Sequence, residues 1–346
     1  MKSREEITGQ AAAASPGGGI LAVDGLRTVF HGRHGAVTAV DGVSLSVSAG
    51  RTLGVVGESG CGKSVMALSI MRLIPPRLGS IEGGTIRCGG RDLLQLSDAE
   101  MHKVRGAEIS MIFQEPMTAL NPVLTIGQQI VETVRLHTGV TRRQARDRAI
   151  EMLRLVQIAE AERHIDSYPH QLSGGMRQRA MIAMALSCNP KVLIADEPTT
   201  ALDVTIQAQI LELLKDLQTR LGTAVIMITH DLGVIAETAQ RVAVMYAGRK
   251  VEEADVESLF DTPLHPYTRG LMKAIPTMDV DDDEPIERRR LHTIDGTVPA
   301  LHDMPEGCSF APRCHMATTQ CRRERPILEE MQPDRWVACW HAERPR

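Results

Sequence analysis

One stretch of eight residues decides the fold of this chain: Gly57-Glu58-Ser59-Gly60-Cys61-Gly62-Lys63-Ser64. It lies between a short apolar run at 53–56, typical of a buried strand, and a helical pattern after Lys63 that is apolar nearly all round. Glycines at this spacing let the backbone curl so that successive N–H groups point at phosphate oxygens, and a helix N-terminus adds partial positive charge. All eight residues are therefore predicted to bind a nucleotide, with Lys63 bridging its β- and γ-phosphates and Ser64 holding Mg²⁺.

Length and composition narrow the class of protein. The chain has 346 residues, of which 43% are hydrophobic and 24% charged, so it can form about two domains, or one large domain with an appendage. Lys+Arg 39 against Asp+Glu 43 give a formal charge of −4, and we therefore expect no nucleic acid among its partners. No apolar run reaches the roughly 18 residues of a membrane span, and no secretory signal is visible. These features predict a cytosolic chain whose 7 cysteines are reduced, metal-bound or catalytic.

Strands that alternate with helices predict an α/β fold with a mainly parallel sheet. Runs that are apolar on both faces, as in strands covered by helices, occur at 53–56, 192–195 and 224–229. Amphipathic helical patterns lie between these runs, at 141–157 and 205–221.

An antiparallel arm is expected before and after residues 57–64, which we call the phosphate loop. Residues 20–50 alternate in polarity, most clearly where Val43, Leu45 and Val47 face inward and Ser44, Ser46 and Ser48 face outward. A second short strand pair is expected at 83–90.

Two further segments are candidates for phosphate chemistry. Residues 172–179 read Leu-Ser-Gly-Gly-Met-Arg-Gln-Arg and precede a helical stretch, and residues 192–197 form an apolar strand that ends in Asp196 and Glu197. Carboxylates at the C-terminal end of a parallel strand meet the phosphates at the crevice of the sheet. Asp196 is predicted to hold Mg²⁺, and Glu197 is predicted to orient or deprotonate the attacking water.

In combination these motifs resemble the ATP-binding cassette (ABC) ATPases, over roughly residues 20–270. Gln114 matches that family's Q-loop and would be a further Mg²⁺ ligand, Asp203 matches its D-loop, and His230 its catalytic switch histidine. Taken singly, Gln114 is typical of a solvated side chain and His230 of a structural histidine. The order of all the motifs along the chain favours the functional interpretation.

The resemblance implies that two cassettes dimerise head to tail around ATP. The segment that closes over the partner's nucleotide would contain Ser173, Gly174, Gly175 and Gln178. In this family an aromatic residue of the first strands stacks on the nucleotide base. Phe30 is the candidate here, and the alternative is an ordinary core aromatic.

More specific stretches are similar to the ATPase subunits of oligopeptide and dipeptide permeases. They are Gln114-Glu-Pro-Met-Thr-Ala-Leu-Asn-Pro122, the segment 173–186, Leu264-His-Pro-Tyr-Thr268 and the Cys-rich C-terminus. The resemblance implies a second homologous ATPase, two transmembrane permease subunits and an extracytoplasmic binding protein as partners, and a peripheral location on the cytoplasmic face of the bacterial membrane. A nickel importer of the same subgroup and a non-transport cassette, in repair or regulation, are the alternatives.

The expected domain boundaries follow composition and resemblance. Residues 1–19 are small and polar and predict a mobile tail, and 20–270 form the ATPase domain with a helical subdomain at about 115–190. Apolar content falls at 279–290, which indicates a solvated linker within a C-terminal region, 271–346, that ends in a Cys-rich domain.

The C-terminal region contains four clustered cysteines: Cys308, Cys314, Cys321 and Cys339. Four thiols in a cytosolic chain are typical of a metal or cluster site, but a Cys-x₂₋₄-Cys pair favoured by zinc is absent. The permease resemblance implies a [4Fe–4S] cluster, and Zn²⁺ or four reduced thiols remain alternatives. His302, His315 and His341 lie nearby in sequence and are expected at the surface.

Overall fold

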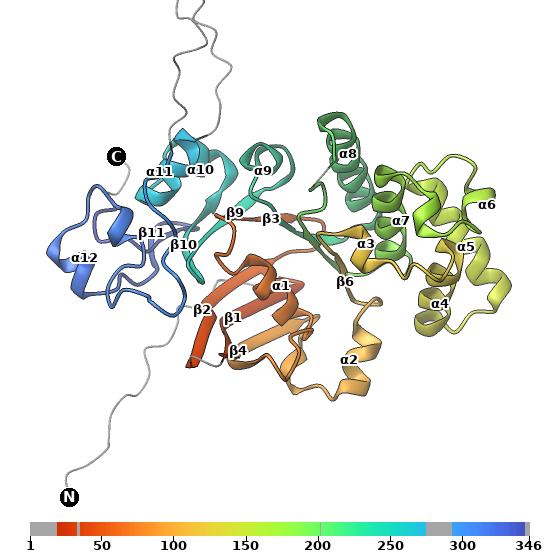
Figure 1. Ribbon diagram of the computed structural model, residues 1–346, viewed down its shortest axis with the longest axis horizontal. Helices are drawn as coiled ribbons and strands as arrows, with labels where there is room; N and C mark the ends of the chain where they lie inside the picture. The colour runs from red at the N-terminus through yellow and green to blue at the C-terminus, as the bar shows by residue number, and fades with distance from the viewer. Residues whose placement is uncertain (1–18, 33–34, 201, 275–292, 343–346) are drawn as a thin grey trace, which may run out of the picture.

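The computed structural model describes residues 19–32, 35–200, 202–274 and 293–342. The predicted tail therefore lies outside the described residues except for Gly19, and the predicted linker at 279–290 lies wholly outside them. Figure 1 shows an elongated molecule with the sheets in the middle, a group of helices at one end and the C-terminal segment at the other.

The larger sheet has eight strands in the order β11-β12-β10-β9-β3-β8-β7-β6. Its parallel part contains β3 (Thr52–Val56), β6 (Ile109–Ile112), β7 (Val192–Asp196), β8 (Ala224–Ile228) and β9 (Arg241–Tyr246). Every residue of β3, β7 and β8 is buried, which confirms the three predicted apolar strands. The predicted α/β class is confirmed.

The C-terminal region extends this same sheet. Strand β10 (Arg249–Asp255) pairs antiparallel with β9 and with β12 (Arg335–Val337), and β12 pairs with β11 (Glu329–Gln332). Glu252 lies opposite Val337 in this pairing. The Cys-rich region is thus joined to the larger sheet by backbone pairing, which the sequence pattern did not predict.

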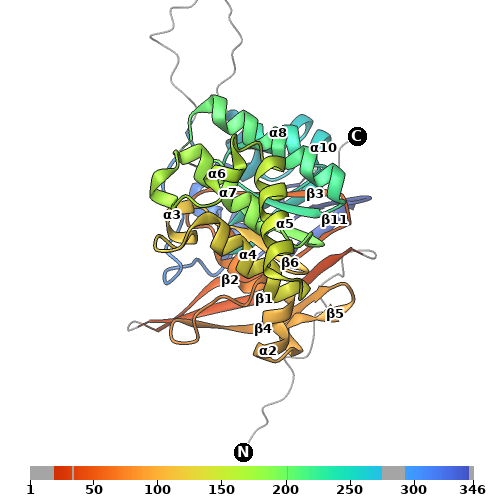
Figure 2. The same ribbon diagram turned by 90° about the vertical axis from the view of Figure 1, so that its right-hand side faces the viewer.

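The smaller sheet is antiparallel, with the order β2-β1-β4-β5. It consists of β1 (Leu21–Gly32), β2 (Gly35–Val47), β4 (Gly79–Cys88) and β5 (Arg91–Asp92), and Figure 2 shows it as a separate layer beside the larger sheet. Val43, Leu45 and Val47 are buried as predicted. The outward position expected for Ser44 is wrong, because its hydroxyl accepts a hydrogen bond from the N–H of Gly25 at 2.8 Å and the residue is buried.

The helices fall into three groups. Helix α1 (Lys63–Ile70) lies between the sheets, and α2 (Asp98–Val104) leads into β6. The group at one end of the molecule comprises α3 (Pro116–Ala119), α4 (Ile126–Thr138), α5 (Arg142–Leu155), α6 (Ala161–His164) and α7 (Gly174–Leu186). The remaining helices are α8 (Val204–Leu221), α9 (Leu232–Thr238), α10 (Val256–Asp261), α11 (Pro266–Lys273) and α12 (Thr319–Arg323).

Local signals explain where the longer helices begin and end. Thr125 and Thr141 start α4 and α5 with capping boxes, and the Asp203 carboxylate starts α8 by accepting from the N–H of Ile206 at 2.9 Å. Gly222 ends α8 in the left-handed conformation. None of the helices in the described ranges has the length and apolar character that crossing a membrane would require.

Apolar packing holds α1 rigidly under the phosphate loop. Met66 and Ile70 are fully buried and pack in one core with residues of both sheets, such as Val43 and Ile226. Close packing of this kind leaves little room for movement. The loop that precedes α1 therefore has a fixed foundation.

Candidate nucleotide site

The phosphate loop leaves the buried strand β3 and enters α1 in a conformation that requires glycine. Gly57 and Gly62 have φ angles of 152° and 101°, and a Cβ at Gly62 would lie 2.5 Å from the carbonyl oxygen of Ala39. Among the described residues no side chain caps α1, and the first N–H groups of a helix have no acceptor within the helix. This arrangement suits a phosphate anion.

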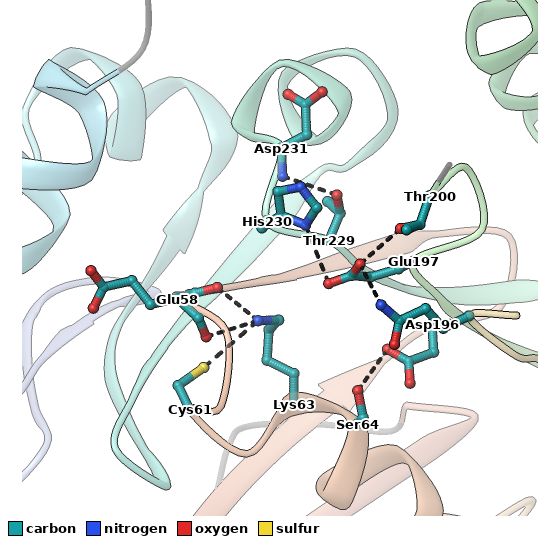
Figure 3. A network of polar contacts seen from close by, with 12 residues as sticks. Glu58, Cys61, Lys63, Ser64, Asp196, Glu197, Thr200, Thr229, His230 and Asp231 are labelled. Carbon is teal, nitrogen blue, oxygen red and sulfur yellow. Dashed lines mark hydrogen bonds and ion pairs between the residues drawn. The ribbon is translucent and has the colours of Figure 1, made fainter. Parts of the chain in front are cut away.

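Lys63 is buried and is hydrogen-bonded to the loop itself. Its Nζ donates to the carbonyl oxygens of Gly57 at 2.7 Å and Glu58 at 3.1 Å, and its Nζ lies 3.8 Å from the Sγ of Cys61 (Figure 3). Burial raises the pKa of the Cys61 thiol, and this thiol is therefore neutral. The ammonium group is thus held by the loop's own carbonyl oxygens.

Ser64 and Asp196 meet at the end of strand β7. The Ser64 hydroxyl donates to Oδ1 of Asp196 at 3.2 Å, and burial raises the pKa of this carboxyl group. A hydroxyl and a carboxylate oxygen are ligands that Mg²⁺ prefers, and a bound cation would favour the ionised form of the carboxyl group. The two residues fit Mg²⁺.

Glu197 is the centre of a second group of polar contacts. Its carboxylate accepts from the Thr200 hydroxyl at 2.8 Å and lies 3.2 Å from Nδ1 of His230 (Figure 3). It also accepts from Nε2 of Gln114 at 3.0 Å. Burial alone would raise the pKa of Glu197, but the hydrogen bonds to Thr200 and His230 bring this pKa below its usual value. The side chain is therefore an ionised, oriented hydrogen-bond acceptor.

The backbone of Glu197 is strained. Its φ is 47°, a left-handed conformation that glutamate rarely adopts, and its N–H donates to the carbonyl oxygen of Ile228 on the neighbouring strand at 2.8 Å. Strain of this kind persists where surrounding contacts fix the geometry, and it is common at functional sites. Here it turns the Glu197 side chain from the end of β7 toward Gln114 and His230.

The residues predicted to act on a partner's nucleotide lie apart from this group. Ser173 caps α7 by accepting from the N–H of Met176 at 3.3 Å, and Ser173 and Gly174 are exposed. Gln178 is buried and donates to the carbonyl oxygen of Pro198. In the described part of the chain, no hydrogen bond joins Ser173, Gly174 or Gly175 to the phosphate loop.

Phe30 lies in β1 opposite Val37 and Gly79 and is partly buried. This position is compatible with either role expected from the sequence. Its stacking on a base remains a prediction.

The four C-terminal cysteines do not form a metal site in the described residues, where no group of three or more His, Cys, Asp or Glu side chains could hold a metal ion. The predicted [4Fe–4S] cluster and its zinc alternative are thus not supported. Two of the cysteines are nevertheless neighbours, because the N–H of Cys308 donates to the carbonyl oxygen of Cys321 at 2.8 Å. Burial and the nearby thiols of Cys308, Cys314 and Cys321 raise the pKa of Cys339 to about 11. His341, expected at the surface, lies with Nε2 3.4 Å from Sγ of Cys321.

Two matches to protein families cover most of the chain. Residues 40–200 match the family described as ABC transporter, and residues 251–321 match the oligopeptide/dipeptide transporter C-terminal region. The chain is 56% identical over 323 residues, 93% of its length and 95% of the relative's, to the "Probable peptide ABC transporter ATP-binding protein y4tR" of Sinorhizobium fredii. This chain is a member of the ABC transporter family.

Other members of the ABC transporter family agree with this assignment. The "Oligopeptide transport ATP-binding protein AppD" of Bacillus subtilis is 51% identical over 93% of this chain and 96% of its own length. Among solved structures, a dimeric post-hydrolysis state of the cassette MJ0796 bound to ADP and Pi has a TM-score of 0.61 at 29% identity, covering 68% of this chain and 98% of that one. The fold described above is therefore that of an ABC cassette.

Sequence reasoning missed three residues that this ABC cassette places at its site. Thr200 donates to Glu197, while Tyr267 and Arg313 contact Glu58 of the phosphate loop from far along the chain. Tyr267 lies in a stretch that the sequence singles out only by resemblance, and Arg313 lies beside a predicted cluster cysteine. No spacing rule connects residues 255 positions apart, as Arg313 and Glu58 are.

Proposed function

We propose that this chain binds and hydrolyses Mg·ATP and energises a membrane importer of oligopeptides or dipeptides. Two sets of contacts support the ATPase part of this proposal. Ser64 of the phosphate loop contacts Asp196. Gln114 and His230 both contact Glu197, the next residue along the chain. The peptide part rests on the match to the oligopeptide/dipeptide transporter C-terminal region and on relatives named for peptide transport. These matches favour peptide import over nickel import and over a non-transport role.

In the proposed reaction some residues bind the nucleotide and Mg²⁺, and others act on the attacking water. Lys63 and the loop backbone at 57–62 would bind the phosphates, and Ser64, Asp196 and Gln114 would hold Mg²⁺, which neutralises phosphate charge when bound. Glu197 would orient and deprotonate the attacking water.

His230 has two proposed tasks. It positions the Glu197 carboxylate through the 3.2 Å contact, and its ring, with 64% of the side chain exposed, is accessible to a γ-phosphate.

We propose that a second cassette completes each nucleotide site. The exposed α7 N-terminus, with Ser173, Gly174 and Gly175, would meet the γ-phosphate of the partner's ATP, with Gln178 behind it and Asp203 at the interface. The dimeric form of the solved cassette MJ0796 supports this arrangement. Phe30 is proposed to stack on the base.

The remaining assignments follow from membership in a peptide transporter group. We propose as partners a second homologous ATPase, two transmembrane permease subunits and an extracytoplasmic binding protein, and a peripheral location on the cytoplasmic face of the membrane. The helices at about 115–190 would form the subdomain that faces the permease within an ATPase domain at 20–270. The region 271–346 would be the C-terminal peptide-transporter domain.

For the cysteines, the [4Fe–4S] cluster implied by resemblance is proposed on the proximity of the four thiols, against the absence of a ligand group among the described residues. Anaerobically purified protein should then be brown, with broad absorption that Cys314→Ser bleaches. Stoichiometric zinc in a colourless preparation, or neither metal, would contradict the cluster.

The ATPase proposal is tested with Glu197→Gln. We expect ATP binding to remain, turnover to fall about 100-fold or more, and ATP to trap a dimer that size-exclusion chromatography with light scattering detects. Lys63→Ala is the matched control and should lose nucleotide binding itself. Wild-type turnover in Glu197→Gln would contradict the assignment of the base.

The substrate is tested in cells. A deletion strain should fail to grow on defined di- or oligopeptides as its sole amino-acid source, and the wild-type gene should restore growth. The gene encoding the Glu197→Gln variant should not.

A further inference from the structure

The phosphate loop is contacted from the C-terminal extension of its own chain. Arg313 forms a two-pronged ion pair with Glu58, with Nη1 2.6 Å from Oε2 and Nη2 2.9 Å from Oε1. The Arg313 side chain is only 4% exposed. Paired hydrogen bonds between a guanidinium and a carboxylate are strong and fix the orientation of both groups.

Glu58 is held from two further directions. Its N–H donates to the Tyr267 hydroxyl at 2.8 Å, and its carbonyl oxygen accepts from Nζ of Lys63 at 3.1 Å. Glu58 lies between Gly57 and the loop residues up to Gly62, where glycines give the backbone many accessible conformations. Fixing Glu58 therefore limits the backbone conformations available to this glycine-rich part of the loop.

Arg313 is itself fixed in place. Its Nε donates to the carbonyl oxygen of Asp295 at 2.9 Å and its Nη2 to that of Ile294 at 3.1 Å. The guanidinium also lies 5.9 Å from the ring centre of Tyr246 and 6.0 Å from that of Phe310. These contacts set the direction of the guanidinium before any nucleotide binds.

An aromatic cluster joins the extension to the core behind the loop. Tyr246, Tyr267 and Phe310 have ring centres 4.6 to 5.5 Å apart, and they come from β9, α11 and the extension. The chain has 3 tyrosines, 4 phenylalanines and 2 tryptophans, so these three rings are a third of its aromatic residues. Such pairs add to the stabilisation from burial alone.

We infer that Arg313 is a positioning residue for ATP binding: through Glu58 the C-terminal extension fixes the phosphate loop of its own chain in the conformation that receives the nucleotide. This inference rests on the proposed function, since it presupposes that the loop binds ATP. Displacing the turn around Cys308 and Cys314 that contains Arg313 would release Glu58. The extension is thereby part of the nucleotide site, although it need not touch the nucleotide.

The test measures the Kd of a fluorescent ATP analogue with Mg²⁺ in the purified full-length chain. Arg313→Ala should raise the Kd about tenfold, which corresponds to about 1.4 kcal/mol, because the two-pronged ion pair that fixes Glu58 is lost. Arg313→Lys should restore part of the loss, because lysine keeps the charge but not the two-pronged geometry. Arg325→Ala is the matched control from the same extension: Arg325 lies 3.8 Å from Asp41 on β2, and its loss should leave the Kd unchanged.

Glu58→Gln approaches the contact from the loop and leaves the bonds of Arg313 to Ile294 and Asp295 in place. It should raise the Kd similarly, and the double variant Glu58→Gln/Arg313→Ala should bind no more weakly than the weaker single variant. Hydrogen exchange of the amides at 57–62, measured without nucleotide, should be faster in Arg313→Ala than in the wild type. A Kd unchanged in both Arg313→Ala and Glu58→Gln would overturn the inference, whereas failure of the wild type itself to bind ATP would overturn the proposed function instead.

Discussion

Two glycine-rich segments of this chain lead into helices, and they are built in opposite ways. In the phosphate loop before α1, Gly57 and Gly62 have positive φ angles, and Lys63 is buried. In the segment before α7, Gly174 and Gly175 have no positive φ, and a Cβ at Gly174 would meet nothing within 4 Å. The first segment is enclosed by its own chain, and the second is an open helix N-terminus.

This difference agrees with the proposal that each cassette supplies half of a shared nucleotide site. The phosphate loop has its supports in place, from Glu58 and its contacts to the α1 foundation. The α7 segment has its helix cap, Ser173, and exposed N–H groups around Gly174. We expect substitutions in the first segment to affect folding and binding together, and substitutions in the second to affect mainly events that involve another molecule.

The largest expected contrast is between Gly62→Ala and Gly174→Ala. Alanine at position 62 must adopt φ near 101° with its Cβ 2.5 Å from a carbonyl oxygen, so we expect a loss of more than about 2 kcal/mol in the free energy of unfolding, and loss of ATP binding. Gly174→Ala should stay within about 0.5 kcal/mol of the wild type and bind ATP normally as a monomer. Urea unfolding measures the stability of each variant, and nucleotide titration measures its ATP binding. Equal destabilisation by Gly62→Ala and Gly174→Ala would contradict the comparison.

A pH-dependent effect concerns the support behind the phosphate loop. His265 accepts from the N–H of Tyr267 through Nδ1 at 3.0 Å, and burial, with a contribution from Arg269, lowers the pKa of His265 to about 3. Because this pKa lies below the unfolded value of about 6.5, the stabilisation is complete above pH 6.5 and is lost as the pH falls toward 3. The free energy of unfolding should fall by up to about 1.4 kcal/mol per pH unit in this window.

His265→Asn is the matched variant, because asparagine keeps an acceptor for Tyr267 but does not titrate. Urea unfolding from pH 7 to pH 4 should show a shallower fall in the variant than in the wild type. Parallel curves would mean that His265 does not carry this dependence.

The smallest expected effect is that of Ser173→Ala on the open segment. Removing the hydroxyl removes the cap that accepts from Met176, at a cost of about 1 kcal/mol in the free energy of unfolding. ATP affinity of the monomer should not change, whereas dimer formation in the Glu197→Gln background should weaken. Weaker ATP binding by the monomer would show that Ser173 belongs to its own chain's site.

The sequence predicted the strands and helices whose formation depends on the polarity pattern of neighbouring residues. The buried strands β3, β7 and β8 follow from apolar runs, and α5 and α8 follow from their apolar periodicity. Ser44 shows the limit, since its polar side chain is satisfied inside the protein by Gly25, a contact that alternation of polarity cannot predict.

By itself the sequence determined the motifs, their order and the identity of the groups that we propose to face the phosphates, because each motif is a short run whose backbone geometry is set by its own residues. Only the tertiary structure decided that Glu197 accepts from Gln114 and Thr200, and that Arg313 reaches Glu58 across 255 positions. Such pairs form when separate elements pack against each other, and the direction of each side chain is then fixed by neighbours that lie anywhere in the chain. The same holds for the extension, whose strands join the sheet through backbone bonds that leave no trace in residue type.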